Sequence, residues 1–164
     1  MKVWYITVLI IIILAIIFFR IKKCGNPPDN EILHFRFSRG YSLGGAIEQE
    51  LYIENDTVYY KKETFSYRAD KDVKLLEVVD TMFLKELEKI IRDNHLALWN
   101  GFEQSNSNVM DGNNFTLRIT YKNGQSISAN GYMMYPQGYQ KVETELDEFF
   151  KTVEDSLAKR DTPF

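Results

Sequence analysis

Residues Val3 to Phe19 form an uninterrupted run of 17 residues that carries no charge and only one small polar residue, Thr7. A run of this length is at the short end for a helix that crosses the hydrocarbon core of a bilayer. Trp4 and Tyr5 lie at its start and cations follow its end, which is typical of the interfacial ends of membrane helices. The pattern predicts a transmembrane anchor over residues 1–23 and a single-pass protein of the cell membrane.

Two alternatives to a retained anchor are a cleaved signal peptide and a lipoprotein signal. Both have a shorter apolar region that is followed by small residues, whereas Arg20, Lys22 and Lys23 precede Cys24 here. The sequence therefore favours the retained anchor and leaves open whether Cys24 is lipidated. The cations after the run exceed Lys2 and the α-amino group before it by one charge, so the side of the membrane stays undecided.

The part of the chain beyond residue 24 is acidic. It holds all 23 Asp and Glu but only 16 of the 20 Lys and Arg, which gives a net charge of 16 minus 23, or −7. An acidic surface repels phosphate backbones, and no basic stripe with interleaved aromatic residues is present. Nucleic acid is therefore not an expected partner. One cysteine in 164 residues allows no intramolecular disulfide.

The segment 24–30 is predicted to be a Pro/Asn-rich spacer, because it contains Gly25, Asn26, Pro27 and Pro28. No comparable break follows, so residues 31–160 are expected to form one globular domain.

The first half of that domain shows strand patterns. In the segment Ile32–Ser38, Leu33, Phe35 and Phe37 alternate with polar residues, which is the period of a half-buried strand. A glycine-rich turn over 39–45 follows. Strands are also predicted over 65–68 and 73–79.

A hairpin is predicted between Ala46–Glu54 and Thr57–Lys62. A two-residue turn at Asn55 and Asp56 keeps one apolar face, since it pairs Ile53 with Val58 and Leu51 with Tyr60.

A second hairpin begins at Phe115, after an amphipathic helix that Asp80 caps and that ends near Asn94. A two-residue turn at its tip would mix the two faces of the strands. A three-residue loop, Lys122 to Gly124, preserves them. Its predicted pairs are Ile119 with Ile127 and Leu117 with Ala129.

The last element is a helix with an apolar stripe between Val142 and Leu157. The order ββββαββα predicts an α+β fold in which two helices pack on one face of an antiparallel sheet.

Three aromatic, glycine-containing segments are the candidate ligand-binding loops. They are Trp99–Phe102, Met110–Phe115 and Gly131–Tyr139. Loop aromatics can stack on a sugar or a peptide. In a domain this small, the favoured interpretation of Trp99, Phe102, Tyr132 and Tyr139 is that they seal the edge of the sheet. The candidate binding residues are Trp99, Phe102, Asp111, Tyr132, Tyr135 and Tyr139.

These three segments, taken together before an amphipathic helix, resemble an uncharacterised family of small bacterial proteins that follow an N-terminal anchor or a lipoprotein signal. The resemblance extends from about Phe35 to Phe150. It implies a bacterial origin and a domain of these bounds, and it carries no known activity. The chain departs from the lipoprotein members at Lys22 and Lys23.

Catalytic motifs are sparse. Neither a Gly-x-Ser-x-Gly motif nor a phosphate-binding glycine loop is present. His34, His95 and Cys24 lack the spacing of metal ligands, so no metal or cofactor is expected. The favoured hypothesis is a non-enzymatic binding module for a protein or peptide, with its oligomeric state open. The alternative is a small carboxylate-dependent hydrolase or transferase that uses Asp111 with Glu103 or His95.

Overall fold

A computed structural model of the chain describes residue 12 and residues 31–42, 44–66 and 73–160. The predicted anchor and spacer lie outside the described residues, apart from Ile12. Within the described ranges, no helix has both the length and the apolar content needed to cross a bilayer.

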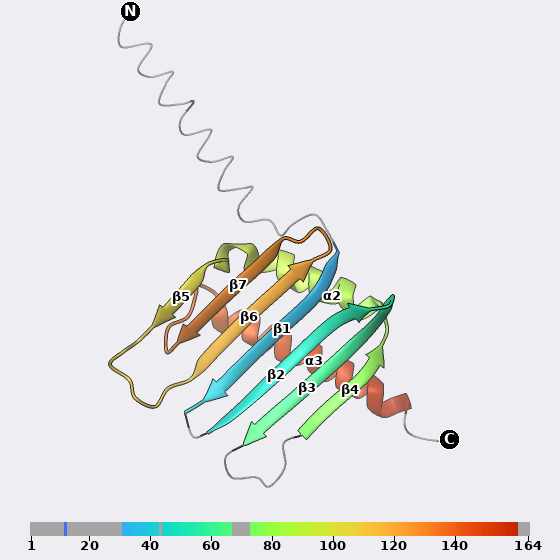
Figure 1. The fold of residues 1–164 in the computed structure, drawn as a ribbon, viewed down its shortest axis with the longest axis horizontal. Helices are drawn as coiled ribbons and strands as arrows, with labels where there is room; N and C mark the ends of the chain where they lie inside the picture. The colour runs from blue at the N-terminus through green and yellow to red at the C-terminus, as the bar shows by residue number, and fades with distance from the viewer. Residues whose placement is uncertain (1–11, 13–30, 43, 67–72, 161–164) are drawn as a thin grey trace, which may run out of the picture.

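The described domain has two layers, one seven-stranded sheet and two helices (Figure 1). The strands are β1 (Ile32–Tyr41), β2 (Gly45–Glu54), β3 (Thr57–Ser66), β4 (Val73–Val79), β5 (Phe102–Ser105), β6 (Asn114–Tyr121) and β7 (Ser126–Tyr132). The helices are α2 (Met82–Asp93) and α3 (Tyr139–Arg160), and a short 3-10 helix η1 (Leu96–Trp99) follows α2. The strand order across the sheet is β4-β3-β2-β1-β6-β7-β5.

The predicted α+β class is confirmed, but the predicted element order is wrong. The order is ββββαβββα, because β5 adds a strand between the two helices. β5 pairs parallel to β7, so the sheet is mixed rather than antiparallel. A strand of four residues with Phe102 as its one apolar residue is too short to show a period of two. Its pairing with β7 holds it in the sheet.

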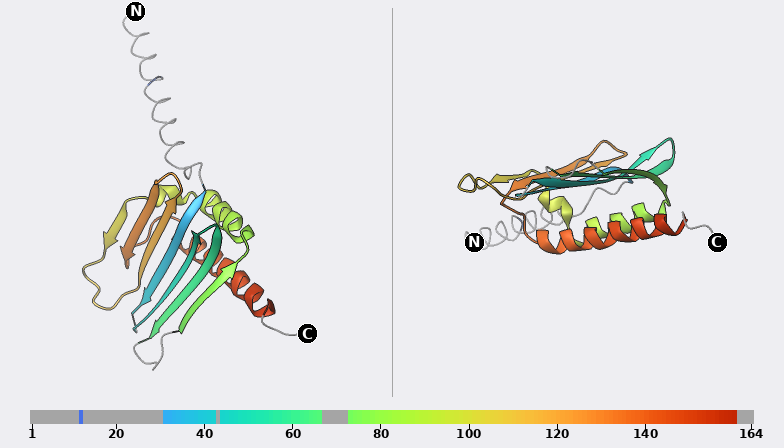
Figure 2. Two further views of the ribbon diagram at one scale, coloured as in Figure 1. Left: turned by 45° about the vertical axis from the view of Figure 1, so that its right-hand side comes forward. Right: turned by 90° about the horizontal axis from the view of Figure 1, so that it is seen from below.

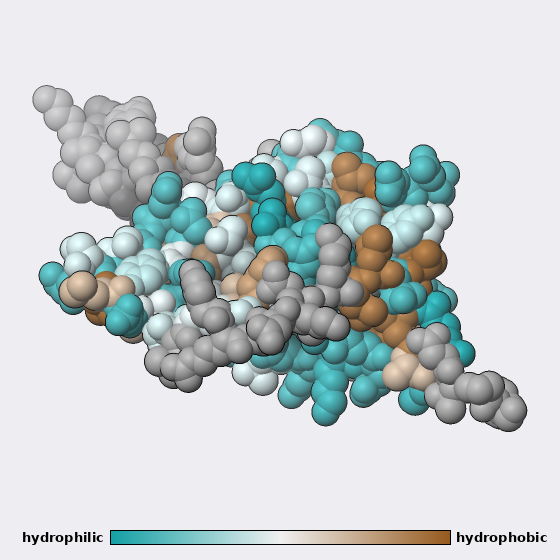
Figure 3. All heavy atoms as spheres, turned by 60° about the horizontal axis from the view of Figure 1, so that its bottom comes forward, coloured by the Kyte–Doolittle hydropathy of each residue, from teal (hydrophilic) through white to brown (hydrophobic). Residues whose placement is uncertain are grey.

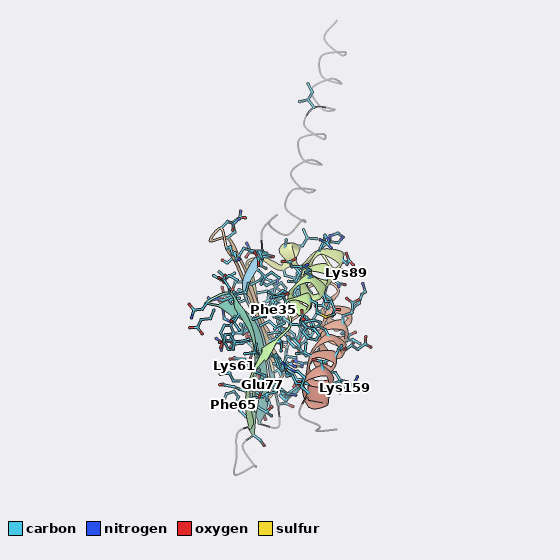
Figure 4. All side chains as sticks on the ribbon, turned by 90° about the vertical axis from the view of Figure 1, so that its right-hand side faces the viewer. Phe35, Lys61, Phe65, Glu77, Lys89 and Lys159 are labelled. Carbon is cyan, nitrogen blue, oxygen red and sulfur yellow. The ribbon has the colours of Figure 1, made fainter. Side chains whose placement is uncertain are left out.

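Both helices lie against one face of the sheet, and no described element covers the other (Figure 2). The covered face holds the core, which includes Phe35 and Phe37 of β1 and Phe150 of α3. We call the other side the open face. Figure 4, which views the molecule from the β4 side, shows Phe35 between the layers and Lys61 on the open face.

Both predicted hairpin registers are confirmed. Asn55 and Asp56 have positive φ angles of 49° and 59°, as a two-residue hairpin turn requires. The pairs Ile53–Val58 and Leu51–Tyr60 form as expected. In the second hairpin Gly124 has φ +82°, and Ile119 pairs with Ile127 and Leu117 with Ala129. β3 continues to Ser66, and the rest of the predicted 65–68 strand lies outside the described residues.

The prediction that Leu33 faces the core is wrong. The pairing of β1 with β6 shifts register between Ile32 and His34, which is typical of a β-bulge. Ile32 is therefore fully buried, while Leu33 is 37% exposed. The N-cap position of α2 is occupied by Thr81 rather than by the predicted Asp80. The Asp80 carboxylate nevertheless accepts a hydrogen bond of 2.7 Å from the backbone N–H of Met82.

The β4 edge of the sheet is apolar on its open face. Leu76 and Val78 are exposed there, and Figure 3 shows an area of hydrophobic side chains on that side of the molecule. Arg160 of α3 donates a hydrogen bond of 2.8 Å to the carbonyl of Val78. A charged side chain that occupies a strand edge hinders pairing with another chain.

Candidate functional site

Three loops meet at one end of the sheet, which we call the loop end. They comprise the described residues 42 and 44 between β1 and β2, 106–113 between β5 and β6, and 133–138 between β7 and α3. The chain enters β1 at the opposite end, where Glu31 accepts a hydrogen bond of 3.0 Å from the backbone of Lys122 (Figure 1). The loop end is therefore separated from the start of β1 by the length of the strands.

Hydrogen bonds tie the three loops together. The backbone N–H of Met133 donates to the carbonyl of Asn113 at 2.9 Å, and the hydroxyl of Tyr132 donates to the carbonyl of Met110 at 2.9 Å. The carboxamide oxygen of Asn113 accepts a bond of 3.1 Å from the backbone of Ser42. Because each loop is bonded to another, they form a joint surface.

That surface contains a cavity of about 320 Å³. Tyr41 and Tyr135 are exposed side chains at its margin, and Tyr139 and Arg39 are buried within it. Glu143, from the first turns of α3, completes the polar part of the lining. The cavity thus combines aromatic rings, one guanidinium and one carboxylate.

Arg39 is fixed beneath this cavity. Only 6% of the residue is exposed, and its Nη2 and Nη1 atoms lie 2.6 and 2.8 Å from the two carboxylate oxygens of Asp147. Bidentate pairs of this kind hold both partners in one geometry. The Glu143 carboxylate is farther from Arg39, at 3.6 Å. The guanidinium also lies 5.3 Å from the ring centroid of Phe37.

Tyr139 links the cavity to the core. Its ring centroid lies 4.5 Å from that of Tyr135 and 4.7 Å from that of Phe115. Its hydroxyl donates a hydrogen bond of 3.2 Å to Glu143. Burial and the negative charge of Glu143 raise the pKa of Tyr139 well above its ordinary value. The hydroxyl therefore stays protonated and remains a hydrogen-bond donor.

The six predicted site residues fall into three positions. Tyr135 and Tyr139 line the cavity. Tyr132 braces the loops, and Asp111 is exposed on the loop that Tyr132 holds.

Trp99 and Phe102 belong to the aromatic cluster behind the cavity. Trp99 is buried, stacks on Tyr139 at 6.0 Å and donates to the carbonyl of Gln137 at 3.2 Å. Phe102 packs on Phe115 at 6.1 Å. These contacts support the sheet-sealing interpretation for both residues.

The sequence pattern missed Tyr41, Arg39 and Glu143 as site residues. Arg39 was detectable in principle, because it continues the inward alternation of Phe35 and Phe37 along β1. A buried arginine requires an acidic partner. No spacing rule shows that the partner is Asp147, which lies 108 residues away in sequence.

The groups of the alternative, enzymatic hypothesis lie on separate elements. His95 lies between α2 and η1, Glu103 on β5 and Asp111 in the loop beyond it. No hydrogen bond or ion pair joins their side chains in the described part of the chain. The described residues also contain no group of three His, Cys, Asp or Glu arranged to hold a metal ion.

A second charged cluster lies at the centre of the open face, away from the cavity. Glu50 of β2 lies 3.0 Å from His34 and 3.4 Å from Lys61, and Arg36 pairs with Glu48. Burial and a hydrogen bond with Glu50 raise the pKa of Glu48. Burial acts in the same sense on Glu50, but hydrogen bonds with Glu48 and His34 outweigh it and lower the pKa of Glu50.

No protein-family model matches the chain, and no curated protein matches it in sequence.

Proposed function

We propose that the protein is a membrane-anchored, non-enzymatic binding module that captures a protein or peptide at the loop end. The observation that carries this proposal is the exposure of aromatic and methionine side chains at the loop end, with two tyrosines at the margin of the cavity and Met110 on the 106–113 loop. Tyr41 is 42% exposed, Tyr135 39% and Met110 95%. Tyrosine and methionine are enriched at protein interfaces. Tyrosine buries a large area at small entropic cost, and the flexible side chain of methionine adapts to the shape of a partner.

The arrangement of the chain ends supports this function. The apolar run over residues 3–19 is the proposed anchor, and the seven residues of the spacer span at most about 25 Å. β1 then leads away from the entry point for ten residues, or roughly 33 Å at the usual rise per residue. If the anchor spans the membrane, the start of β1 is the membrane-proximal end of the domain. The loop end then lies at the other end of the strands.

The bonding within the cavity favours recognition over catalysis. Arg39 is held by Asp147, and the Tyr139 hydroxyl is bonded to Glu143. A catalytic set would need an accessible nucleophile or base whose pKa is matched to its task. The side chains that line the cavity instead present rings and hydrogen-bonding groups that are held in place.

Peptide selection on the full chain tests this proposal. The protein is purified in detergent micelles, and a library of random peptides displayed on phage is selected against it. We expect enriched peptides whose binding to the Tyr135→Ala variant falls by about tenfold, since truncation of a central aromatic residue typically costs more than 1 kcal/mol of binding energy.

The matched control is Leu98→Ala, which removes an exposed apolar side chain from η1. Binding of the selected peptides should be unchanged in this variant. Peptides that lose affinity equally in both variants, or a selection that enriches no peptide above an empty-micelle background, would overturn the proposal.

A further inference from the structure

We infer that the cavity at the loop end takes a cationic side chain, an arginine or a lysine, of the captured protein or peptide. This inference rests on the proposed function, because it names the chemistry of the partner at the same site. It is carried by the charge balance beneath the cavity and by the aromatic rings around it.

The charge balance leaves one carboxylate in excess. Two carboxylates, Glu143 and Asp147, face the single guanidinium of Arg39. Asp147 binds that guanidinium with both oxygens, at 2.6 and 2.8 Å, whereas Glu143 is 3.6 Å from it. Glu143 lines the cavity and its side chain is 32% exposed. An incoming cation therefore meets a carboxylate that Arg39 neutralises only in part.

The rings around Glu143 suit the same ligand. Tyr135 and Tyr139 lie 4.5 Å apart, ring to ring, and Tyr41 lines the cavity with them. A cation over the faces of aromatic rings is stabilised by their quadrupoles, more strongly when water is excluded. The aliphatic stem of lysine or arginine would pack against these rings and against Met133 while the charged head reaches Glu143.

The opposite charge is disfavoured at this position. Glu143 would repel a carboxylate or phosphate, and the Arg39 guanidinium is already bound to Asp147 through both Nη atoms. The part of the chain beyond residue 24 carries a net charge of −7, which steers cationic partners toward the domain. Local and overall charge thus select the same class of ligand.

Titration with a charged and an uncharged peptide tests the inference. The full chain in detergent micelles carries ¹³C-methyl methionine, and the probes are acetyl-Gly-Arg-Gly-amide and its citrulline analogue, which has the same shape without the charge. Met133 lines the cavity and reports occupancy, while Met82 on α2 reports non-specific effects. We expect a saturable shift of the Met133 signal, with the arginine peptide about tenfold tighter than the citrulline peptide.

The variant Glu143→Gln should abolish the preference for arginine, since its amide oxygen can still accept the Tyr139 hydrogen bond and keep the cavity intact. Glu148→Gln removes the same charge from an exposed position on α3 and should leave the preference unchanged. A melting temperature within a few degrees of wild type for both variants confirms that the fold is kept.

Three results would overturn the inference. They are equal affinity for the two peptides, no shift at Met133 with either peptide, and a preference for arginine that survives Glu143→Gln. Each of these three results can be distinguished from a failure of the proposed binding function. Peptides that depend on Tyr135 but carry no basic residue would leave the binding function standing and remove the cationic ligand.

Discussion

At the scale of single residues, the aromatic cluster at the loop end has two kinds of member. Trp99 and Tyr139 are buried, and their polar atoms are bonded to Gln137 and Glu143. Tyr135 stacks on Tyr139 but keeps more than a third of its surface exposed. Because burial fixes how much packing a side chain contributes, variants of the two kinds should separate stability from binding.

We expect Trp99→Ala to lower the free energy of unfolding by about 3–5 kcal/mol, since it leaves a large cavity and an unpaired carbonyl. Tyr135→Ala should cost about 1 kcal/mol or less, because the side chain is partly exposed. Urea unfolding of the full chain in micelles, followed by far-ultraviolet circular dichroism, measures both. Equal losses in the two variants would show that Tyr135 is a core residue.

The carboxylates of Glu48 and Glu50 make stability depend on pH. Burial and the neighbouring Glu50 raise the pKa of Glu48 above its ordinary 4.5, so the native state holds that proton more tightly than the unfolded state. The contribution of Glu48 to stability is therefore present below the unfolded pKa and is lost as the pH rises through the native pKa. The lowered pKa of Glu50 acts in the opposite sense.

The variant Glu48→Gln removes the first of these effects. The free energy of unfolding of the variant minus that of the wild type should increase as the pH rises from about 4 to about 7. Only the wild-type protein then loses stability at this site. Urea titrations at several pH values give the difference, and Glu103→Gln on the exposed surface of β5 controls for the change in net charge. A difference that is constant, or that falls with pH, would contradict the assignment.

At the scale of elements, the bulge at the start of β1 decides which residue enters the core. Ile32 is fully buried and Leu33 is partly exposed, although the alternation with Phe35 and Phe37 favours Leu33 as the core residue. A one-residue shift in strand register moves every side chain that precedes it to the opposite face of the strand. The two neighbouring aliphatic residues should therefore respond very differently to the same truncation.

We expect Ile32→Ala to destabilise the protein by about 2–5 kcal/mol and Leu33→Ala by about 0.5 kcal/mol or less. Thermal and urea unfolding of the two variants side by side provide the measurement. A larger loss for Leu33→Ala would mean that β1 follows the simple alternation without a bulge.

The elements differ in how far sequence patterns predict them. Both hairpin registers follow from keeping Ile53 with Val58 and Ile119 with Ile127, because a slip would expose an apolar face. β5 could not be predicted, since its placement depends on parallel pairing with β7 rather than on its own pattern. Local patterns record which face is apolar, and they do not record long-range pairing.

Sequence patterns likewise predict some residues of the candidate site and not others. Tyr135 and Tyr139 were recognisable as loop aromatics in a glycine-containing segment. Arg39 was detectable only as an inward-facing cation, and Glu143 was not detectable, because their pairing depends on a contact between β1 and α3 that brings distant residues together. The chemistry that distinguishes the cavity from ordinary aromatic packing is therefore visible only in the folded chain.

At the scale of the whole molecule, we propose different roles for the two ends of the sheet. At one end, the chain that follows the proposed anchor enters β1, beside Glu31 and the turn at 122–125. The other end collects the three loops, the cavity and the exposed side chains of Tyr41, Met110 and Tyr135. The fold would then act as a spacer that presents the loop end to a partner.

Site-specific photo-cross-linking in intact cells tests whether the loop end contacts a partner. A photoreactive amino acid is placed either at Met110, at the loop end, or at Asn123, in the exposed turn at the other end. We expect a discrete cross-linked partner from position 110, lost when Tyr135→Ala is added, and no such adduct from position 123. Adducts from position 123 alone, or equal adducts from both positions, would contradict this expectation.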